Sequence, residues 1–430
     1  MFGGVNDTAT SNTTSHQVVL PFYGYASLAY LAATLLLAFS SNAFTGHYFH
    51  PHILTITHIM ALGWGTMMIL GASYQLVPVL IERKLYSPVM AQISFVLAGL
   101  GIPLLCYGFY IFNMGWPAQF GGWLILSSVL LYLINLAISM AKSQEENVHA
   151  FFVFTATLWL LATVVVGLLL VYNFTHPLLP RSSLDYLPVH AHLGIAGWFL
   201  LLVIGVGSRL IPMFLISKYS HTRILWWIYG LINGGLLSFI GFFLYSDNRV
   251  WLLVPTAAIA IGLLLFALFC YRSYMQRIRK KVDEPMQVSL LSVLMLFLPL
   301  VFLVVILLLL IFGPAGNTLY VSAYGFVILF GWITAIILGM TFKTLPFIIW
   351  NKVYHLLAGR QKTPNPKDLF NESVFKWMSL AYLAGFVLFC GGILLQNQIV
   401  LQAAAVLLLI SSVLYNWNVI RLLLHKPAVV

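Results

Sequence analysis

Long apolar runs dominate this chain and limit what it can fold into. Twelve runs have the length of a membrane-crossing helix, which needs about 20 residues. Their approximate ranges are 18–40, 52–80, 88–112, 119–141, 150–173, 187–216, 223–245, 250–271, 287–312, 319–350, 374–395 and 399–423. Lipid offers the backbone no hydrogen-bond partner, so runs of this length predict helices rather than barrel strands. With 61% hydrophobic and 7% charged residues, the chain is not a soluble enzyme.

The net charge of +11 is gathered in alternate loops. The run Arg277–Lys281 is the densest basic segment, whereas the opposite loops carry only Arg181 and Arg249. This is the pattern of the positive-inside rule, which explains the charge without a nucleic-acid partner. We therefore expect an integral membrane protein with cytoplasmic N- and C-termini.

One stretch occurs three times with a gapless spacing of 134 residues (192 − 58 and 332 − 198). The copies carry, at equivalent positions, His58, Gly63, Trp64, Gly71 and Pro78, then His192, Gly197, Trp198, Gly205 and Pro212, then Phe326, Gly331, Trp332, Gly339 and Pro346. Such an internal period predicts a single transmembrane domain of three repeats, at about 18–142, 150–272 and 287–423. Each repeat is expected to be an arc of four helices, with the marked stretch in its second helix. The glycines would allow close helix packing or leave room for a flat cofactor.

Three polar residues, Gln75, Arg209 and Lys343, also share this spacing, near the predicted cytoplasmic ends of the repeat helices. We expect them to extend to lipid headgroups, as long polar side chains near helix ends do. The alternative is an anion-binding or polar vestibule on that side of the membrane.

Seven of the twelve histidines fall in the predicted outer third of the protein. They are His47, His50, His52, His58, His176, His190 and His192. Neutral imidazole is a good ligand for haem iron, copper and zinc. Because the apolar runs contain almost no acid, imidazole is nearly the only ligand type that they offer.

The spacing of these histidines separates their roles. His190 and His192 are two residues apart, a helical rotation of about 200°, so they point to opposite sides and do not chelate one ion together. His58 and His192 occupy the same slot in consecutive repeats, and this predicts a bis-histidine haem site between two arcs. The histidines in the loop or at its edge, His47, His50 and His52, are better explained as polar residues at a helix start, with a weak copper or zinc site as the alternative.

These features resemble subunit I of the haem-copper oxidase superfamily. The segment His190-Ala191-His192, followed by Gly197-Trp198, is similar to the His-x-His helix of the cbb3-type and nitric-oxide-reductase branch. The layout is also similar to NnrS, a shorter relative implicated in haem and copper binding and nitric oxide stress. The resemblance implies that His58 is an axial haem ligand and that His192 is a copper ligand.

The chain departs from this family at two helices. The seventh helix of the family carries two adjacent histidines, but residues 236–246 of this chain contain none. The tenth helix carries haem ligands, but Tyr324 and Phe326 stand at the positions equivalent to His190 and His192. A permuted order of arcs, with the sixth helix acting as the tenth, still leaves the copper site incomplete. We therefore do not expect oxygen or nitric oxide reduction.

The leading expectation is a haem b-binding protein of a bacterial plasma membrane. His58 and His192 would ligate the iron, Gly63-Trp64 and Gly197-Trp198 would line the cofactor, and His190 would serve a second site, with copper as a second candidate metal. Respiratory electron transfer, or nitric oxide or haem handling, would involve respiratory-chain subunits or an electron donor. Two alternatives are a transporter or channel for a metal or small neutral species, entered through the outer histidines, and a cofactor-free structural subunit of a respiratory complex.

Overall fold

The computed structural model describes residues 14–142, 147–313, 318–358 and 361–427. Within these ranges the protein is helical, and its extended pairing is limited to two isolated bridges. The first half contains α2 (His16–Ser40), η1 (Ser41–Thr45), α3 (Pro51–His58), η2 (Ile59–Thr66), α4 (Met67–Leu80), α5 (Pro88–Tyr110), α6 (Trp116–Ala141), α7 (Val148–Thr175), α8 (Ser183–His192), η3 (Leu193–Leu200) and α9 (Leu201–Leu215). The second half contains α10 (Thr222–Tyr245), η4 (Arg249–Leu252), α11 (Leu253–Met275), α12 (Glu284–Met295), α13 (Phe297–Phe312), α14 (Thr318–Phe326), η5 (Val327–Ile333), α15 (Thr334–Tyr354), η6 (Pro366–Leu369), α16 (Glu372–Leu394) and α17 (Gln398–Leu423).

The predicted number of membrane spans is confirmed. Twelve continuous helical segments among the described residues are long and apolar enough to cross a membrane, from His16–Thr45 to Gln398–Leu423. Many large apolar side chains on them are exposed, as lipid-facing positions require. The protein is thus an integral membrane protein whose helices contact the bilayer.

Polar side chains mark where several helices begin. The Ser87 hydroxyl accepts a hydrogen bond from the backbone N–H of Met90 and so caps α5, with Pro88 at its first position. Asn397 caps α17 in the same way through the N–H groups of Ile399 and Val400. Such caps satisfy N–H groups that have no partner inside the helix. They explain why the short polar segments between apolar runs start new helices.

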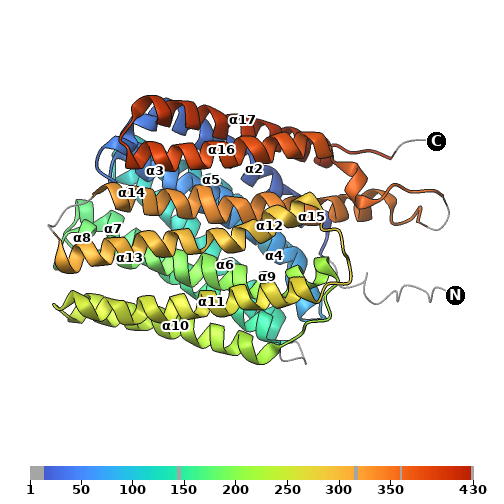
Figure 1. The fold of residues 1–430 in the computed structure, drawn as a ribbon, viewed down its shortest axis with the longest axis horizontal. Helices are drawn as coiled ribbons and strands as arrows, with labels where there is room; N and C mark the ends of the chain where they lie inside the picture. Colours follow the sequence, from blue (N-terminus) through green and yellow to red (C-terminus); the bar gives the residue numbers. More distant parts are fainter. Residues whose placement is uncertain (1–13, 143–146, 314–317, 359–360, 428–430) are drawn as a thin grey trace. The chain divides into compact units, whose positions relative to one another are not determined.

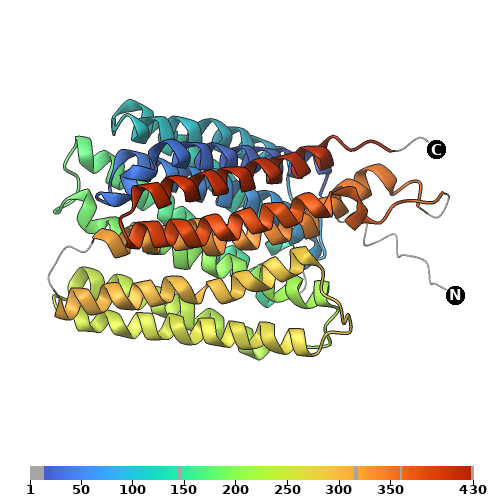
Figure 2. The ribbon, with the colours of Figure 1, turned by 45° about the horizontal axis from the view of Figure 1, so that its top comes forward.

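The chain forms two compact units that do not coincide with the sequence repeats. The first unit consists mainly of Ser73–Lys281, and the second of His16–Ala72, Val282–Phe302 and the described residues after 317. The second unit is held together by buried polar contacts between α2 and α17. Thr34 and Ser412 share a 2.6 Å hydrogen bond, and the Asn416 amide donates to the Ser27 carbonyl. Figures 1 and 2 show α16 beside α17 in this unit.

In the first unit, α7 packs closely on the second-repeat helix. A Cβ added to Gly197 would lie 2.6 Å from Cβ of Trp159, and one on Gly205 would overlap Phe152. The helix pair α5 and α6 is joined by a 3.0 Å hydrogen bond between Ser94 and Ser128. These contacts give the glycines of the second repeat the packing role expected of small residues in membrane helices.

The repeated stretch adopts an unusual backbone that the sequence did not reveal. In all three copies it is π-helical, as η2, η3 and η5. Each π-helical segment contains one Gly-Trp pair, and Trp64, Trp198 and Trp332 are buried. π-Helical turns are rare and are frequently found at functional sites. The third copy has no histidine, so the π-helical backbone accompanies the Gly-Trp sequence rather than the histidine.

The prediction for Lys343 is wrong. Its side chain does not extend to headgroups but is buried, at 7% exposed, and its Nζ lies 2.6 Å from Oδ2 of Asp283. Asp283 also caps α12 by accepting from the N–H of Met286. A buried cation is stabilised by a paired carboxylate, and here the carboxylate lies 60 residues earlier in the chain. Arg209, in contrast, is exposed.

Candidate functional site

His192 is the last residue of α8 and stands directly before the π-helical segment η3. Its Nδ1 lies 2.7 Å from the carbonyl oxygen of Pro188, one helical turn earlier. A carbonyl oxygen only accepts, so Nδ1 is the donor and the neutral ring has its lone pair on Nε2. This is the arrangement usual in metal-ligating histidines, whose other ring N–H donates to a carbonyl or carboxylate.

His58 repeats this geometry in the second unit. It ends α3 directly before η2, and its Nδ1 lies 2.8 Å from the carbonyl oxygen of Leu54, again four residues earlier. Both rings are half-buried within membrane-spanning segments. The two equivalent positions therefore hold imidazoles in the same tautomer, each with its lone pair on Nε2.

His190 has the same tautomer, but the carbonyl that fixes it belongs to a neighbouring helix, α7. Its Nδ1 lies 3.0 Å from the carbonyl oxygen of Thr163 in α7. A Cβ on Gly167, one turn along α7, would lie 2.7 Å from Cε1 of His190, so only glycine leaves room for the ring. The sequence did not single out Thr163 or Gly167, because nothing in their spacing relates them to His190.

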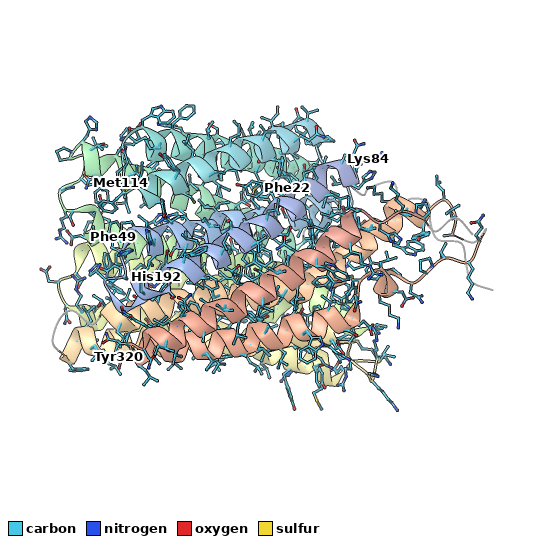
Figure 3. All side chains as sticks on the ribbon, turned by 90° about the horizontal axis from the view of Figure 1, so that it is seen from above. Phe22, Phe49, Lys84, Met114, His192 and Tyr320 are labelled. Atoms are coloured by element: carbon cyan, nitrogen blue, oxygen red, sulfur yellow. The ribbon has the colours of Figure 1, made fainter. Side chains whose placement is uncertain are left out.

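His190 and His192 lie against different helices, as their spacing predicted. His190 contacts α7, whereas the ring of His192 lies 4.8 Å from that of Phe239 in α10. The two imidazoles therefore do not face one ion. Figure 3 shows that His192 lies toward the end of the first unit that carries Met114, away from Lys84.

The surroundings of His192 are apolar. Val189, Leu193, Ala196 and Leu236 form a buried cluster, on which further side chains of α7, α10 and α11 pack: Trp159, Ala162, Val166, Phe239, Ile240, Phe243 and Ile259. Among the described residues, no three His, Cys, Asp or Glu side chains gather where they could hold a metal ion.

In the third copy, the position equivalent to His58 and His192 is held by Phe326, which packs among other phenyl rings. Phe326 is buried and stacks on Phe330, Phe386 and Phe389, with ring centroids 5.0, 5.9 and 4.5 Å away. Phe44 meets it edge-on. This slot is closed by packing and offers no ligand atom.

The glycine and tryptophan candidates are built into the core of each unit. Gly63 and Trp64 are buried in the second unit, where Trp64 stacks on Tyr30 at 4.7 Å and donates from Nε1 to Oγ1 of Thr334 at 3.2 Å. In the first unit Trp198 is buried, and Gly197 contacts Trp159. Their contacts here are packing contacts, and their contact with a cofactor stays a prediction.

The histidines of the turn before α3, His47 and His50, have hydrogen bonds of the opposite direction at Nδ1. Nδ1 of His50 accepts from the backbone N–H of His52 at 3.2 Å, and Nδ1 of His47 accepts from that of Phe49 at 3.1 Å. The neutral rings therefore carry their proton on Nε2, and His50 serves as the N-cap of α3. Partial burial and the nearby His52 imidazole lower the pKa of His50 from its usual value. His176 belongs to the first unit, where its Nδ1 contacts the Thr175 hydroxyl.

His149 is a further histidine that the sequence did not mark as a candidate. It lies in the first turn of α7, and its Nδ1 is 2.9 Å from the carbonyl oxygen of Gly205. Its ring is half-buried and has the same tautomer as that of His192. No repeat equivalence or spacing pointed to it, because its acceptor lies 56 residues away.

His58 belongs to the second unit, and His190 and His192 belong to the first. The geometry above is that of each unit by itself, and the convergence of His58 and His192 on one haem stays a prediction. No model of a known protein family matches the chain, and no curated protein matches it either.

Proposed function

We propose that this protein binds haem b, has the layout of haem-copper oxidase subunit I and lacks a complete binuclear centre. The observation that supports it most is the shared state of His58 and His192. Both occupy the same slot before a π-helical segment, and both donate Nδ1–H to the carbonyl four residues earlier. Each neutral ring is thereby oriented as an Nε2 ligand.

The residues present suit haem better than copper. An axial haem ligand needs one imidazole in apolar surroundings, and His192 stands beside Phe239 and the Leu236 cluster. Copper in such proteins takes several nitrogen or sulfur ligands, and no group of three or more His, Cys, Asp or Glu side chains stands at His192 among the described residues. Haem held at these histidines would supply one-electron transfer.

In this proposal the protein carries electrons or handles haem or nitric oxide in a bacterial plasma membrane. The basic loops and both termini would face the cytoplasm, and His58 and His192 would lie near the outer surface. Residues 236–246 contain no histidine, and Phe326 stands at the repeat position of His192, so the ligand set of a reductase would be incomplete. The role would thus be transfer or binding, in contact with an electron donor or respiratory subunits.

A pyridine haemochrome assay with iron quantification on the purified full-length protein tests this function. The expected result is haem b in stoichiometric amount, reduced strongly in His58→Ala and in His192→Ala. His50→Ala is the matched control, because its ring has the opposite polarity, and it should keep full haem content. A colourless protein without iron, or equal haem in all variants, would contradict the proposal.

A further inference from the structure

The ends of α9 and α11 in the first unit are joined by a short antiparallel bridge. Ser217 pairs with Arg277, and the N–H of Ile278 donates to the carbonyl of Ile216 at 3.0 Å. Ile216 adopts a left-handed backbone conformation, with φ of 51°, that β-branched residues rarely tolerate. Such strain is found where the surrounding structure enforces it, often at binding sites.

Two buried donors in this bridge region make no hydrogen bond within the part of the chain that the structure describes. They are the Tyr219 hydroxyl and Nε of Arg277. Tyr219 is only 9% exposed, with its ring against Phe269. Arg277 is held by two contacts of Tyr274, whose carbonyl accepts from Nη1 at 2.7 Å and whose ring lies 3.8 Å below the guanidinium. Buried donors without an acceptor cost about 1–3 kcal/mol each, so two of them on these paired segments point to an oxygen-rich ligand.

The charges around the bridge favour an anion. Basic side chains flank it on both segments: Lys218, Arg223, Arg272, Arg279, Lys280 and Lys281. The helix α10 also begins here, at Thr222, and no side chain caps its first N–H groups. The N-terminus of a helix attracts phosphate through these N–H groups and its dipole.

The rim of the bridge is apolar and exposed. Met275 and Ile278 are each 59% exposed, and Ile216 is also exposed. Free phosphate would gain nothing from such side chains, whereas a phospholipid combines a phosphate with acyl chains. The bridge also lies at the ends of two membrane spans, where headgroups are found.

We propose that this bridge binds the phosphate of an anionic membrane phospholipid. Arg277 Nε and the Tyr219 hydroxyl donate to phosphate oxygens, and the N-terminus of α10 and the flanking basic residues neutralise its charge. Met275 and Ile278 contact the acyl chains. This site is separate from the histidine slots and does not depend on haem binding.

Native mass spectrometry of the full-length protein in detergent tests the proposal. Phosphatidylglycerol and phosphatidylcholine with identical acyl chains are titrated against wild type, Arg277→Gln and Tyr219→Phe. We expect wild type to prefer phosphatidylglycerol, and Arg277→Gln to lower that affinity roughly tenfold, as loss of a charge-assisted hydrogen bond does. Tyr219→Phe should lower it roughly threefold. Arg83→Gln, at an exposed basic residue of another loop in the same unit, should leave it unchanged.

Three results would overturn this assignment. The first is equal affinity for the two lipids, and the second is an Arg277→Gln or Tyr219→Phe variant with unaltered affinity for phosphatidylglycerol. The third is displacement of phosphatidylglycerol by millimolar inorganic phosphate, which would make the site one for free phosphate. If Arg277→Gln does not fold, Tyr219→Phe carries the test, because it removes one hydroxyl and keeps the packing on Phe269.

Discussion

The second and third copies of the repeated stretch share a backbone but differ in what fills their slot. Both contain a π-helical segment with a buried tryptophan, η3 in one and η5 in the other. His192 in the second copy is half-buried and donates to the Pro188 carbonyl, whereas Phe326 in the third is enclosed by phenyl rings. The π-helical backbone therefore does not require a histidine.

This comparison separates the residues that go with the π-helical backbone from the residue that stands directly before it. The Gly-Trp sequence accompanies the π-helical segment in every copy, and the residue before that segment decides whether the position holds an imidazole or a packed phenyl ring. The turn before α3 shows that the presence of an imidazole is not enough. His50 uses Nδ1 as an acceptor and caps a helix, so its neutral ring does not present Nε2 as a ligand.

The largest effect on stability is expected when Phe326, in the packed third copy, is replaced by histidine. Phe326→His should lower the free energy of unfolding by about 3 kcal/mol, because the phenyl stack is lost and a ring N–H is buried without a partner. Chemical denaturation in detergent would measure this, with Phe326→Leu as a control for lost aromatic contact alone. A histidine tolerated there with no loss of stability would mean that the slot is not closed by packing.

A smaller effect is expected from crowding His190. Gly167→Ala places a methyl group 2.7 Å from the His190 ring and should displace it from the Thr163 carbonyl, lowering the free energy of unfolding by about 1–2 kcal/mol. Gly230→Ala in α10 is the control, since a Cβ there meets nothing within 4 Å and alanine favours the helix. If both variants are stabilised alike in thermal denaturation, the close contact of Gly167 with His190 is refuted.

Replacing the second-slot histidine by phenylalanine should cost little stability but abolish haem binding. Phe239 and Phe243 already surround the site, so His192→Phe is expected to change the free energy of unfolding of the haem-free protein by less than about 1.5 kcal/mol. The haem absorption band should be lost from the same preparation. If His192→Phe is severely destabilised and still retains haem, the proposed difference between the His192 and Phe326 positions is wrong.

The smallest effect is a pH dependence of stability that arises in the turn before α3. The pKa of His50 is lowered in the folded protein, so its contribution to stability is present above its unfolded pKa, near 6.5, and is lost as pH falls through the folded pKa. Protonation also removes the Nδ1 acceptor that caps α3. His50→Asn keeps a good cap without titrating, so its melting temperature should fall less than that of wild type between pH 8 and pH 5. Identical pH profiles would contradict this role.

The helices were largely predictable from sequence because hydropathy reports long apolar runs directly. The last run was expected at 399–423 and forms Gln398–Leu423. The first, expected at 18–40, continues to Thr45, because the polar residues Ser41 and Asn42 extend it as a 3₁₀ turn. The π-helical segments could not be predicted, since these helices are apolar on every side and show no clear periodicity.

The site was predictable only where it depended on local spacing. The opposite directions of His190 and His192 follow from helical geometry and are confirmed. Contacts between distant residues were not accessible, such as the pairing of Lys343 with Asp283 or the stacking of Phe326 on Phe386. Hydrogen-bond polarity, which distinguishes His192 from His50, likewise depends on coordinates.

The central claim is that His192 acts as a ligand through Nε2, and imidazole rescue tests it most directly. The absorption spectrum of full-length His192→Gly protein would be recorded with and without added imidazole. The account predicts that the haem b band is lost in the variant and returns when imidazole occupies the space left by the side chain. An unaltered band in the variant, or a lost band that imidazole does not restore, would contradict it.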